Sequence, residues 1–480
     1  MQTADRLETK TQSRRNFLKK ASLATGMLIL PSGFLRGQNA PSNRINAACV
    51  GFGGQGSIDS NGVHNGGATI IGVCDVNAYS RSRAKKRHPN ATAFEDYRVM
   101  FDKLGKDIDA VVVSTPDHTH FTVAYDAVLR GKHVYVQKPM CHSIDQVRRL
   151  SKAAAEHKII SSMGNQGHSS NHIRMVREWF EAGFFGEIDT VDAWTGQFMR
   201  APENYNKPSP KPKDLNWDLW LGPAKYREFF HGVAPGWRPY LEFGSGSLGD
   251  MAAHVIDPAY YILQLDAPEK IEIIESSGPT KVAHAEHAKI AFHFPAKGKR
   301  GPVKLVWWHG KNFRPSAPEG LNYREFNERK DDDLLPENTK LNLHPSVGGR
   351  LSKRHNDGLT LNGSLFYGKK LSFNMGQYGD FFYTAPHEKF AELKQKAPPA
   401  KYGRFRGGHY RDWINAIRKN IPAVSDFTYA GPLTEVIIQG IIALRLGRTL
   451  NWDAKNGKFI NDDAANALLY SPKPRTGFYA

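Results

Sequence analysis

A glycine-rich turn near the start of the chain constrains its fold more than any other feature. Residues 51–56 are Gly-Phe-Gly-Gly-Gln-Gly, directly after the apolar run 45–50 and before a segment with helical character. A second apolar run, 68–74, ends at Asp75. A strand, a G-x-G-x-x-G turn, a helix and a second strand with a terminal acid form the βαβ unit that binds a dinucleotide. The sequence therefore predicts a parallel sheet built around this turn.

Each part of the turn has a physical role in cofactor binding. Gly51 would make the tight turn, Gly53 would let the backbone approach a pyrophosphate, and Gly56 would let helix and strand pack. The N-terminus of the helix would face the phosphates. Asp75 would bond the ribose hydroxyls and repel a 2′-phosphate, so we expect NAD rather than NADP. The predicted cofactor residues of this unit are Gly51, Phe52, Gly53, Gly54, Gln55, Gly56 and Asp75.

Strands and helices continue to alternate after this unit. Strands are expected at 110–113, 131–136 and 159–163, and helices at 119–130 and 143–157. Strands joined by helices give a parallel, doubly wound sheet, whose ligands bind beyond the carboxyl ends of the strands. Lys138 follows the strand 131–136. A lysine at that edge could polarise a substrate hydroxyl or carbonyl.

The second half of the chain has the pattern of a sheet-rich domain. β-Branched and aromatic segments bounded by Gly or Pro predict strands at 188–197, 270–276, 288–294, 303–309 and 364–367. Helices are predicted at 172–182, 410–418 and 434–446, with a short one at 464–469. Residues 311–361 are polar and irregular, which is typical of an insertion.

One further motif has the composition of a proton-transfer site. Asp250, His254 and Asp257 are spaced by four and three residues, which places them on one face if the segment is a single helix. A carboxylate beside an imidazole at the start of an apolar helix suits acid–base chemistry. The structural alternative is a capped core helix, in which Asp250 caps the N-terminus and His254 bonds to a neighbour.

The N-terminus has the features of an export signal. Residues 13–19 are Ser-Arg-Arg-Asn-Phe-Leu-Lys, followed by the apolar run 21–30, which is short for a membrane span. Paired arginines followed by Phe-Leu-Lys resemble a twin-arginine signal. We expect residues 1–43 to be signal and linker, and the mature protein to be periplasmic or otherwise exported, without stable membrane insertion.

Composition excludes several classes of function. The formal net charge is +18, but the basic residues are dispersed and no nucleic-acid-binding motif is present, so no nucleic-acid partner is expected. The three cysteines lack metal-ligand spacing, so neither a metal site nor a disulfide framework is predicted.

From residue 44 onward the chain resembles the Gfo/Idh/MocA family of sugar oxidoreductases. The matching motifs occur in order and are Gly51–Gly56 with Asp75, Ser114-Thr-Pro-Asp-His-Thr-His120, Gly131-Lys-His-Val-Tyr-Val-Gln-Lys138-Pro139 and Gly249-Asp250-x3-His254-x2-Asp257. Later motifs, among them Trp237-Arg238-Pro-Tyr240, resemble the twin-arginine-exported branch. The family usually has Glu-Lys-Pro where this chain has Gln137-Lys138-Pro139. Lys138 is kept, but it loses a neighbouring charge.

The resemblance implies a Rossmann domain, 44–165, followed by a substrate-binding α+β domain, 166–480, with an open, mostly antiparallel sheet. It implies that Lys138, Asp250 and His254 surround a sugar. By the same resemblance, the cofactor site would add Ser114, Thr115, Pro116, His120, Gln137 and Asn165. By position, His168, Arg238 and Asp257 are candidates for substrate binding, Asp257 being one turn deeper.

Three functions are compatible with this sequence. The first is an NAD-dependent sugar oxidoreductase in which His254 or Lys138 takes the hydroxyl proton, Lys138 stabilises the oxyanion and Asp250 orients His254. The second is a redox-neutral glycosidase or lyase that cleaves a glycoside through a keto intermediate, with NAD held tightly. The third is a sugar-binding protein without catalysis. A homo-oligomer is expected, because open sheets of this fold commonly pair subunits.

Overall fold

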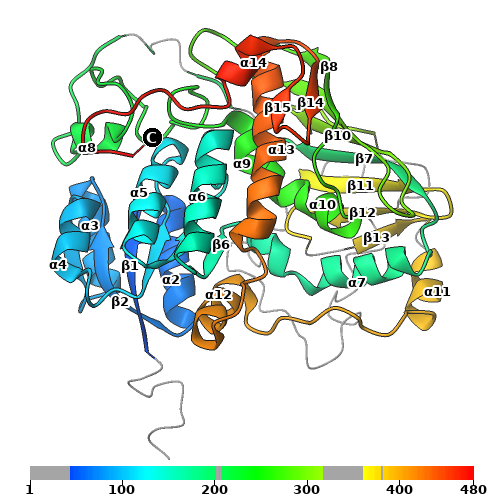
Figure 1. Cartoon of the computed structure of the whole chain (residues 1–480), viewed down its shortest axis with the longest axis horizontal. Helices are drawn as coiled ribbons and strands as arrows, with labels where there is room; N and C mark the ends of the chain where they lie inside the picture. The colour runs from blue at the N-terminus through cyan, green and yellow to red at the C-terminus, as the bar shows by residue number, and fades with distance from the viewer. Residues whose placement is uncertain are drawn as a thin grey trace, which may run out of the picture. The chain divides into compact units, whose positions relative to one another are not determined.

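The computed structural model describes residues 44–479, except residues 198, 202–204, 206, 317–360, 380–381 and 387. The predicted signal, 1–43, and most of the predicted insertion, 311–361, lie outside the described residues. Residues 45–480 form one compact unit that contains two sheets (Figure 1).

The first sheet is the predicted parallel one. Its six strands lie in the order β3-β2-β1-β4-β5-β6, and every neighbouring pair is parallel. The strands are β1 (Ile45–Val50), β2 (Ala68–Cys74), β3 (Thr92–Phe94), β4 (Ala110–Val113), β5 (His133–Val136) and β6 (Ser161–Met163). The intervening helices are α2 (Gly54–Asn65), α3 (Ala78–Arg87), α4 (Tyr97–Leu104), α5 (Asp117–Leu129) and α6 (Ile144–Glu156).

Alternate side chains of the central strand β4 enter two separate cores. Val111 and Val113 pack in the core that holds α5 and α6. Val112 packs on the other side with α2 and with α12 (Gly408–Lys419). A strand buried on both faces needs a continuous apolar sequence, which explains the run of Ala and Val in β4. Helix α12 therefore returns from the C-terminal part of the chain to cover the first sheet.

The second sheet has nine strands in the order β13-β12-β11-β7-β10-β9-β8-β14-β15. The β7–β10 pair is parallel and the other pairs are antiparallel. The predicted fold class is thus confirmed. The strands are β7 (Ile188–Thr195), β8 (Lys270–Ser276), β9 (Ala288–Phe294), β10 (Val303–His309), β11 (Asn362–Gly368), β12 (Ser372–Gly376), β13 (Phe382–Ala385), β14 (Leu450–Asp453) and β15 (Lys458–Phe459).

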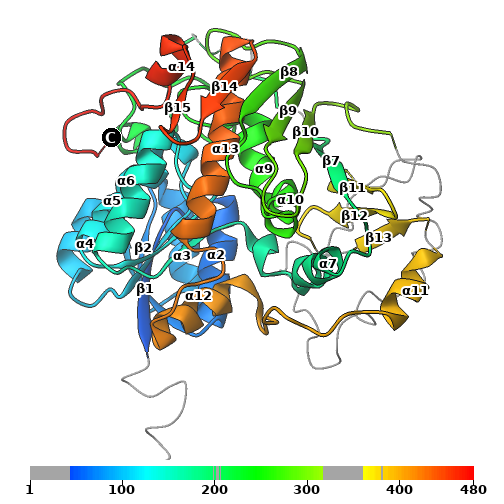
Figure 2. The same ribbon diagram turned by 45° about the vertical axis from the view of Figure 1, so that its right-hand side comes forward.

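Helix α13 connects the two halves of this unit. The remaining helices are η2 (Gln166–Ser169), α7 (Asn171–Glu181), α8 (Trp217–Leu221), α9 (Gly246–Val255), α10 (Asp257–Ile262), α11 (Lys389–Gln395), α13 (Phe427–Leu446) and α14 (Asp463–Ala467). Helix α13 packs against α6 on one side and against α9 and β8 on the other (Figure 2). Among the described helices it alone has the length and apolarity of a membrane span. However, 72% of its apolar 18-residue stretch is buried inside the protein, as in a core helix.

The helix predicted through Asp250, His254 and Asp257 is two helices. Helix α9 ends at Val255, and α10 starts at Asp257 with Pro258 in its first turn. Proline suits the first turn of a helix because it has no N–H to donate, but it interrupts a helix that precedes it. The prediction of a single face is therefore wrong for Asp257, whereas Asp250 and His254 share α9.

Candidate active site

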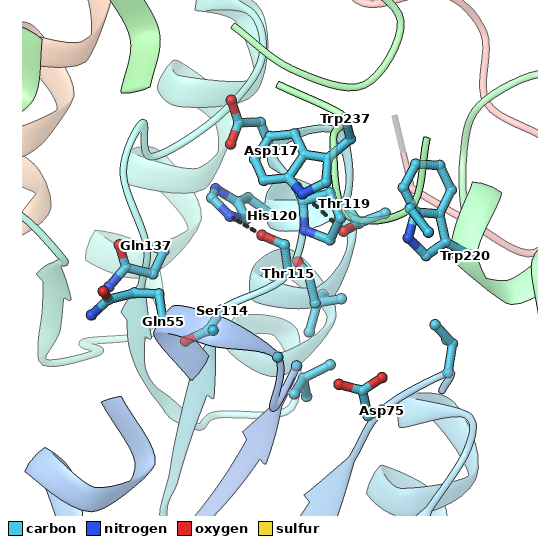
Figure 3. Close-up of a pocket in the computed structure, with 18 of the residues that line it drawn as sticks. Gln55, Asp75, Ser114, Thr115, Asp117, Thr119, His120, Gln137, Trp220 and Trp237 are labelled. Carbon is cyan, nitrogen blue, oxygen red and sulfur yellow. Dashed lines mark hydrogen bonds between the residues drawn. The ribbon is translucent and has the colours of Figure 1, made fainter. Parts of the chain in front are cut away.

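A cavity of about 840 Å³ extends from the glycine-rich turn to α9. Figure 3 shows its wall at the ends of the parallel strands, with Asp75, Ser114, Thr115, His120 and Gln137 directed toward it. The predicted site residues that line it are Gly51, Gly53, Gly54, Gln55, Asp75, Ser114, Thr115, Pro116, His120, Gln137, Lys138, Arg238, Asp250 and His254.

The glycine-rich turn has the geometry that a dinucleotide needs. Gly51 has φ +88°, and a Cβ there would lie 2.4 Å from the carbonyl oxygen of Ser114. A Cβ at Gly56 would lie 2.2 Å from the carbonyl oxygen of Gly51. Gly53 faces open space within the cavity lining, so a phosphate can approach its backbone. Only glycine fits at positions 51 and 56, and Gly53 leaves room for the cofactor.

Asp75 holds the turn as well as facing the cavity. Its carboxylate accepts hydrogen bonds from the backbone N–H of Phe52 at 2.7 Å and of Asn77 at 2.8 Å. Burial raises the pKa of Asp75, and these hydrogen bonds oppose that rise. Phe52 contributes its backbone here, because its ring is 2% exposed and lies in a core.

Three charged side chains meet at the other end of the cavity. Lys138 Nζ lies 2.7 Å from Asp250 Oδ1, and Arg238 Nε lies 3.0 Å from the same oxygen. Burial opposes ionisation of Asp250, but the two cations and their hydrogen bonds outweigh burial and hold its pKa below the usual range. The Asp250 carboxylate therefore pairs with Lys138 and Arg238. Its expected role in orienting His254 stays a prediction.

His254 lines the cavity one helical turn after Asp250. Its ring centroid lies 4.9 Å from that of Tyr378, another lining residue. His120 sits between two carbonyl oxygens. Its Nε2 lies 2.9 Å from that of Thr115 (Figure 3), and its Nδ1 lies 2.8 Å from that of Pro139. The imidazole of His120 is thus fixed as part of the wall.

Five predicted site residues lie outside the cavity lining: Phe52 and Gly56 of the glycine-rich turn, and Asn165, His168 and Asp257. Asp257 pairs with His168 Nδ1 at 3.0 Å, and it accepts hydrogen bonds from Asn165 at 3.3 Å and from Tyr429 at 2.7 Å. Asp257, His168 and Asn165 are at most 2% exposed. They form a buried cluster because α10 starts a new direction at Asp257. Gln166, which follows Asn165 in the chain, does line the cavity.

A buried carboxylate that the sequence analysis missed joins the elements of the cofactor cleft. Asp59 of α2 accepts hydrogen bonds from Gln55 at 2.8 Å, Ser114 at 2.6 Å, Gln137 at 2.9 Å and Tyr410 at 2.7 Å. Burial raises its pKa, and the four hydrogen bonds oppose that rise. No spacing pattern marks Asp59, because three of its four partners come from segments other than α2.

Asp117 also lines the cavity but was not among the predicted site residues, although the motif 114–120 contains it. Asp117 follows Pro116 at the start of α5 and is 4% exposed. Trp220 and Trp237 line the cavity, whereas Trp194 and Trp307 are core residues with 0% exposure. The described residues contain no group of three or more side chains placed to hold a metal ion.

Two models of one protein family match this chain. The NAD-binding Rossmann-fold model of the Gfo/Idh/MocA oxidoreductase family matches residues 45–165, and its C-terminal alpha/beta-domain model matches residues 173–299. Together they cover just over half of the chain. The chain belongs to the Gfo/Idh/MocA oxidoreductase family. The geometry of the glycine-rich turn agrees with NAD as the cofactor of this Rossmann fold.

Curated relatives of this family member include sugar-acting proteins. A glycosyl hydrolase family 109 protein from Solibacter usitatus is 32% identical over 37% of this chain and 44% of its own. Levoglucosan dehydrogenase from Pseudarthrobacter phenanthrenivorans is 25% identical over 40% of this chain and 42% of its own. The matched region thus spans less than half of either relative.

The fold also matches solved structures. The WlbA dehydrogenase from Chromobacterium violaceum, in complex with NADH and UDP-GlcNAcA, has a TM-score of 0.57 at 17% identity and covers 89% of this chain and 100% of its own. At that identity the likeness shows the fold alone.

Proposed function

We propose that this protein is an NAD-dependent oxidoreductase that acts on a ring hydroxyl of a sugar or glycoside, with NAD held tightly. One observation carries this proposal. Lys138, Asp250 and His254 line the same cavity as the glycine-rich turn and Asp75. A proton-handling group and a dinucleotide-binding turn in one enclosed space are what alcohol oxidation requires. The sugar-acting relatives support carbohydrate as the substrate class.

The residues divide the chemistry among them. NAD, when bound, supplies the hydride acceptor for the carbinol carbon. Lys138 donates a hydrogen bond to the substrate oxygen and stabilises the charge that develops there. Asp250 Oδ1 lies 2.7 Å from Lys138 Nζ, and this ion pair holds the Lys138 ammonium in place. His254 takes the hydroxyl proton in this scheme, and Lys138 is the alternative base.

Further side chains suit a sugar ring. Sugars present apolar C–H faces, and Trp220, Trp237 and Tyr378 place aromatic surface in the cavity wall. Arg238 is 39% exposed in its side chain and stacks on Trp237 at 4.4 Å, so its remaining donors can bond a hydroxyl or a carboxylate.

The test uses the full-length protein. Denaturing the purified protein should release NAD. Glycosides and keto-glycosides should then be supplied while nicotinamide absorbance and sugar release are both followed. Lys138→Ala and His254→Ala should each lower turnover by roughly 100-fold or more. Lys152→Ala is the matched control, because that side chain is 76% exposed on α6. Turnover unchanged in both site variants would contradict the assignment and favour a sugar-binding protein without catalysis.

The pH dependence of the two variants separates the possible bases. If His254 is the base, His254→Ala should remove the acidic limb of the kcat/KM profile, and Lys138→Ala should lower the plateau but keep that limb. If Lys138 is the base, the limb should disappear in Lys138→Ala instead.

Redox-neutral cleavage of a glycoside is the second candidate, and the 32% identity to a glycosyl hydrolase family 109 protein favours it. Oxidation of a ring hydroxyl to a ketone would acidify the adjacent C–H. A base then removes that proton, the glycosidic oxygen leaves, water adds and the ketone is reduced back. Sugar release without net formation of NADH would favour this reaction over net oxidation.

Export is part of the proposal. The twin-arginine signal predicted in residues 13–19 would deliver a folded protein to the periplasm with NAD already bound. An exported enzyme cannot draw on a cytoplasmic NAD pool, which is why retention of NAD matters. Arg14→Lys with Arg15→Lys should keep the protein in the cytoplasm, as cell fractionation would show. Normal export of that variant would contradict the signal.

Homo-oligomerisation stays a prediction that light scattering can test.

A further inference from the structure

The adenosine end of the cavity is closed by segments from outside the parallel sheet. Asp75 marks this end, because the acid after the second strand of a Rossmann fold binds the ribose of the adenosine half. The segments that follow β2 and β3 contribute Asn77, Glu95, Asp96 and Tyr97 to this part of the wall, and distant segments contribute Pro212, Asp214, Leu215 and Phe478. We call residues 212–222 the cover loop and residues 475–479 the C-terminal strap.

The cover loop is fastened to the turn that follows β2. Leu215 forms an antiparallel bridge with Asn77. The backbone N–H of Asn216 donates to the carbonyl of Val76 at 2.9 Å. The cover loop therefore lies along the edge of the cavity next to Asp75.

Arg475 ties the C-terminal strap to the cover loop. Its Nε and Nη2 donate to the carbonyl oxygen of Gly222 at 3.0 and 2.8 Å, and Nη2 also donates to the carbonyl oxygen of Asp218 at 2.7 Å. From the Rossmann side, Arg98 Nη1 donates to the carbonyl oxygen of Gly477 at 3.2 Å. These bonds hold the strap between α8 and the start of α4.

The strap presents an aromatic ring to the cavity. Phe478 lines the cavity and is partly buried. The guanidinium carbons of Arg98 and Arg475 lie 4.6 Å and 5.6 Å from its ring centroid. Cations over an aromatic ring stabilise its position. Asp96 and Tyr97, which precede Arg98 in the chain, line the same cavity as this ring, where an adenine could pack against the apolar surface of Phe478.

We propose that the C-terminal strap is part of the NAD site. Phe478 contacts the adenosine half of NAD, and Arg475 keeps the strap closed over it, so that NAD leaves only when the strap opens. This inference rests on NAD as the cofactor and is independent of the sugar reaction.

The test measures dissociation of NADH from the full-length protein. The protein is loaded with NADH, excess NAD is added, and the loss of bound NADH fluorescence is followed. Arg475→Ala should raise the dissociation rate about tenfold, because the strap loses its charged donors. Arg448→Ala should leave the rate unchanged. Arg448 also makes hydrogen bonds with its guanidinium, but they go to Asp462 and not to the cover loop.

Phe478→Ala provides an independent variant. It should weaken binding of ADP-ribose and of NADH by the same factor, because the contact lies on the half that both ligands share. Unchanged dissociation in Arg475→Ala, together with unchanged ADP-ribose affinity in Phe478→Ala, would overturn the proposal. Failure of the unmodified protein to bind NADH would overturn the cofactor assignment and this proposal with it.

Discussion

Asp250 is the residue on which the charges of the site converge. Lys138 and Arg238 both contact its Oδ1, and the Asp250 side chain is 14% exposed. Asp250→Asn would remove the charged carboxylate that both cations contact. We expect a loss of about 3 kcal/mol in the free energy of unfolding. Asp266→Asn is the control, because Asp266 is 67% exposed and its pair with Lys297 should contribute under about 1 kcal/mol.

The same residue gives a pH prediction with a definite sign. The folded state lowers the pKa of Asp250, so its stabilisation is present above the unfolded pKa of about 3.9 and is lost as the pH falls below it. The difference in unfolding free energy between Asp250→Asn and the unmodified protein should therefore be constant between roughly pH 5 and pH 8. Denaturant unfolding at several pH values measures it. A difference that shrinks well above pH 5 would show that Asp250 has an ordinary or raised pKa.

Gln137 and Asp59 form a pair that explains a departure from the family pattern. Gln137 Nε2 donates to Asp59 Oδ2 at 2.9 Å, and both residues are at most 5% exposed. A glutamate at position 137 would place a second buried carboxylate beside the first. Gln137→Glu should lower the thermal midpoint and weaken NADH binding. Adding Asp59→Asn should restore much of the thermal midpoint and of the NADH affinity. The coupling energy between the two substitutions should be about 1 kcal/mol or more. Additive losses would contradict this pairing.

At the residue scale, the sequence revealed the side chains that follow strand ends. Lys138 and Asp75 were predicted because the parallel sheet brings the ends of its strands to one edge. Asp59 could not be predicted. It lies inside a helix, and its four hydrogen-bond donors meet only after α2, α12 and the ends of β4 and β5 are assembled. The pairing of Asp250 with Arg238 likewise depends on the path of an irregular loop.

At the scale of elements, α2 and α12 approach closely at a glycine. A Cβ on Gly62 would lie 2.2 Å from Tyr410 Cδ2, and Tyr410 also donates to Asp59. Gly62→Ala should lower stability by about 1–3 kcal/mol despite the better helix propensity of alanine, because the ring must move. Gly403→Ala is the control, since no atom lies within 4 Å of its added Cβ. Thermal unfolding of both variants measures the difference, and equal midpoints would contradict the close approach.

Some strands were predicted with their observed bounds and others were missed. The seven-residue strands β8, β9 and β10 were predicted with their observed bounds, because they have strand-like composition and clear ends. The missed strands are β3, β12, β13, β14 and β15, which have two to five residues, too few to show clear alternation. Helix α13 was predicted to start at residue 434, but it begins at Phe427, where Asp426 caps it. Pro432, in its second turn, obscured that start.

At the scale of the whole molecule, the order of the two sheets along the chain was predictable and their joint packing was not. The C-terminal segment returns to the first sheet through α12 and to the cavity through Phe478. Both contacts join residues more than 300 positions apart, for example Tyr410 with Asp59. Such contacts leave no local periodicity. Residues from both halves of the unit therefore form the cofactor site.

Buried histidines make the stability of the whole molecule depend on pH. Burial, together with the nearby Arg404, lowers the pKa of His172 to about 4. Both ring nitrogens of His172 are buried without a hydrogen-bond partner among the described residues. A lowered folded pKa gives stability that is present above the unfolded pKa of about 6.5 and is lost as the pH falls toward 4. The folded protein should thus lose roughly 2 kcal/mol through His172 between pH 7.5 and pH 5.

His172→Leu removes this proton linkage while keeping the site apolar. The stability of the variant relative to the unmodified protein should therefore increase by roughly 2 kcal/mol between pH 7.5 and pH 5. Buried acids such as Asp59 are present in both the variant and the unmodified protein. Their contributions to stability, which have the opposite sign, therefore cancel in the difference between the two proteins. His287→Leu serves as the control, since its side chain is 41% exposed. Thermal or denaturant unfolding at the two pH values measures the effect. A relative stability independent of pH would mean that His172 titrates normally in the folded protein.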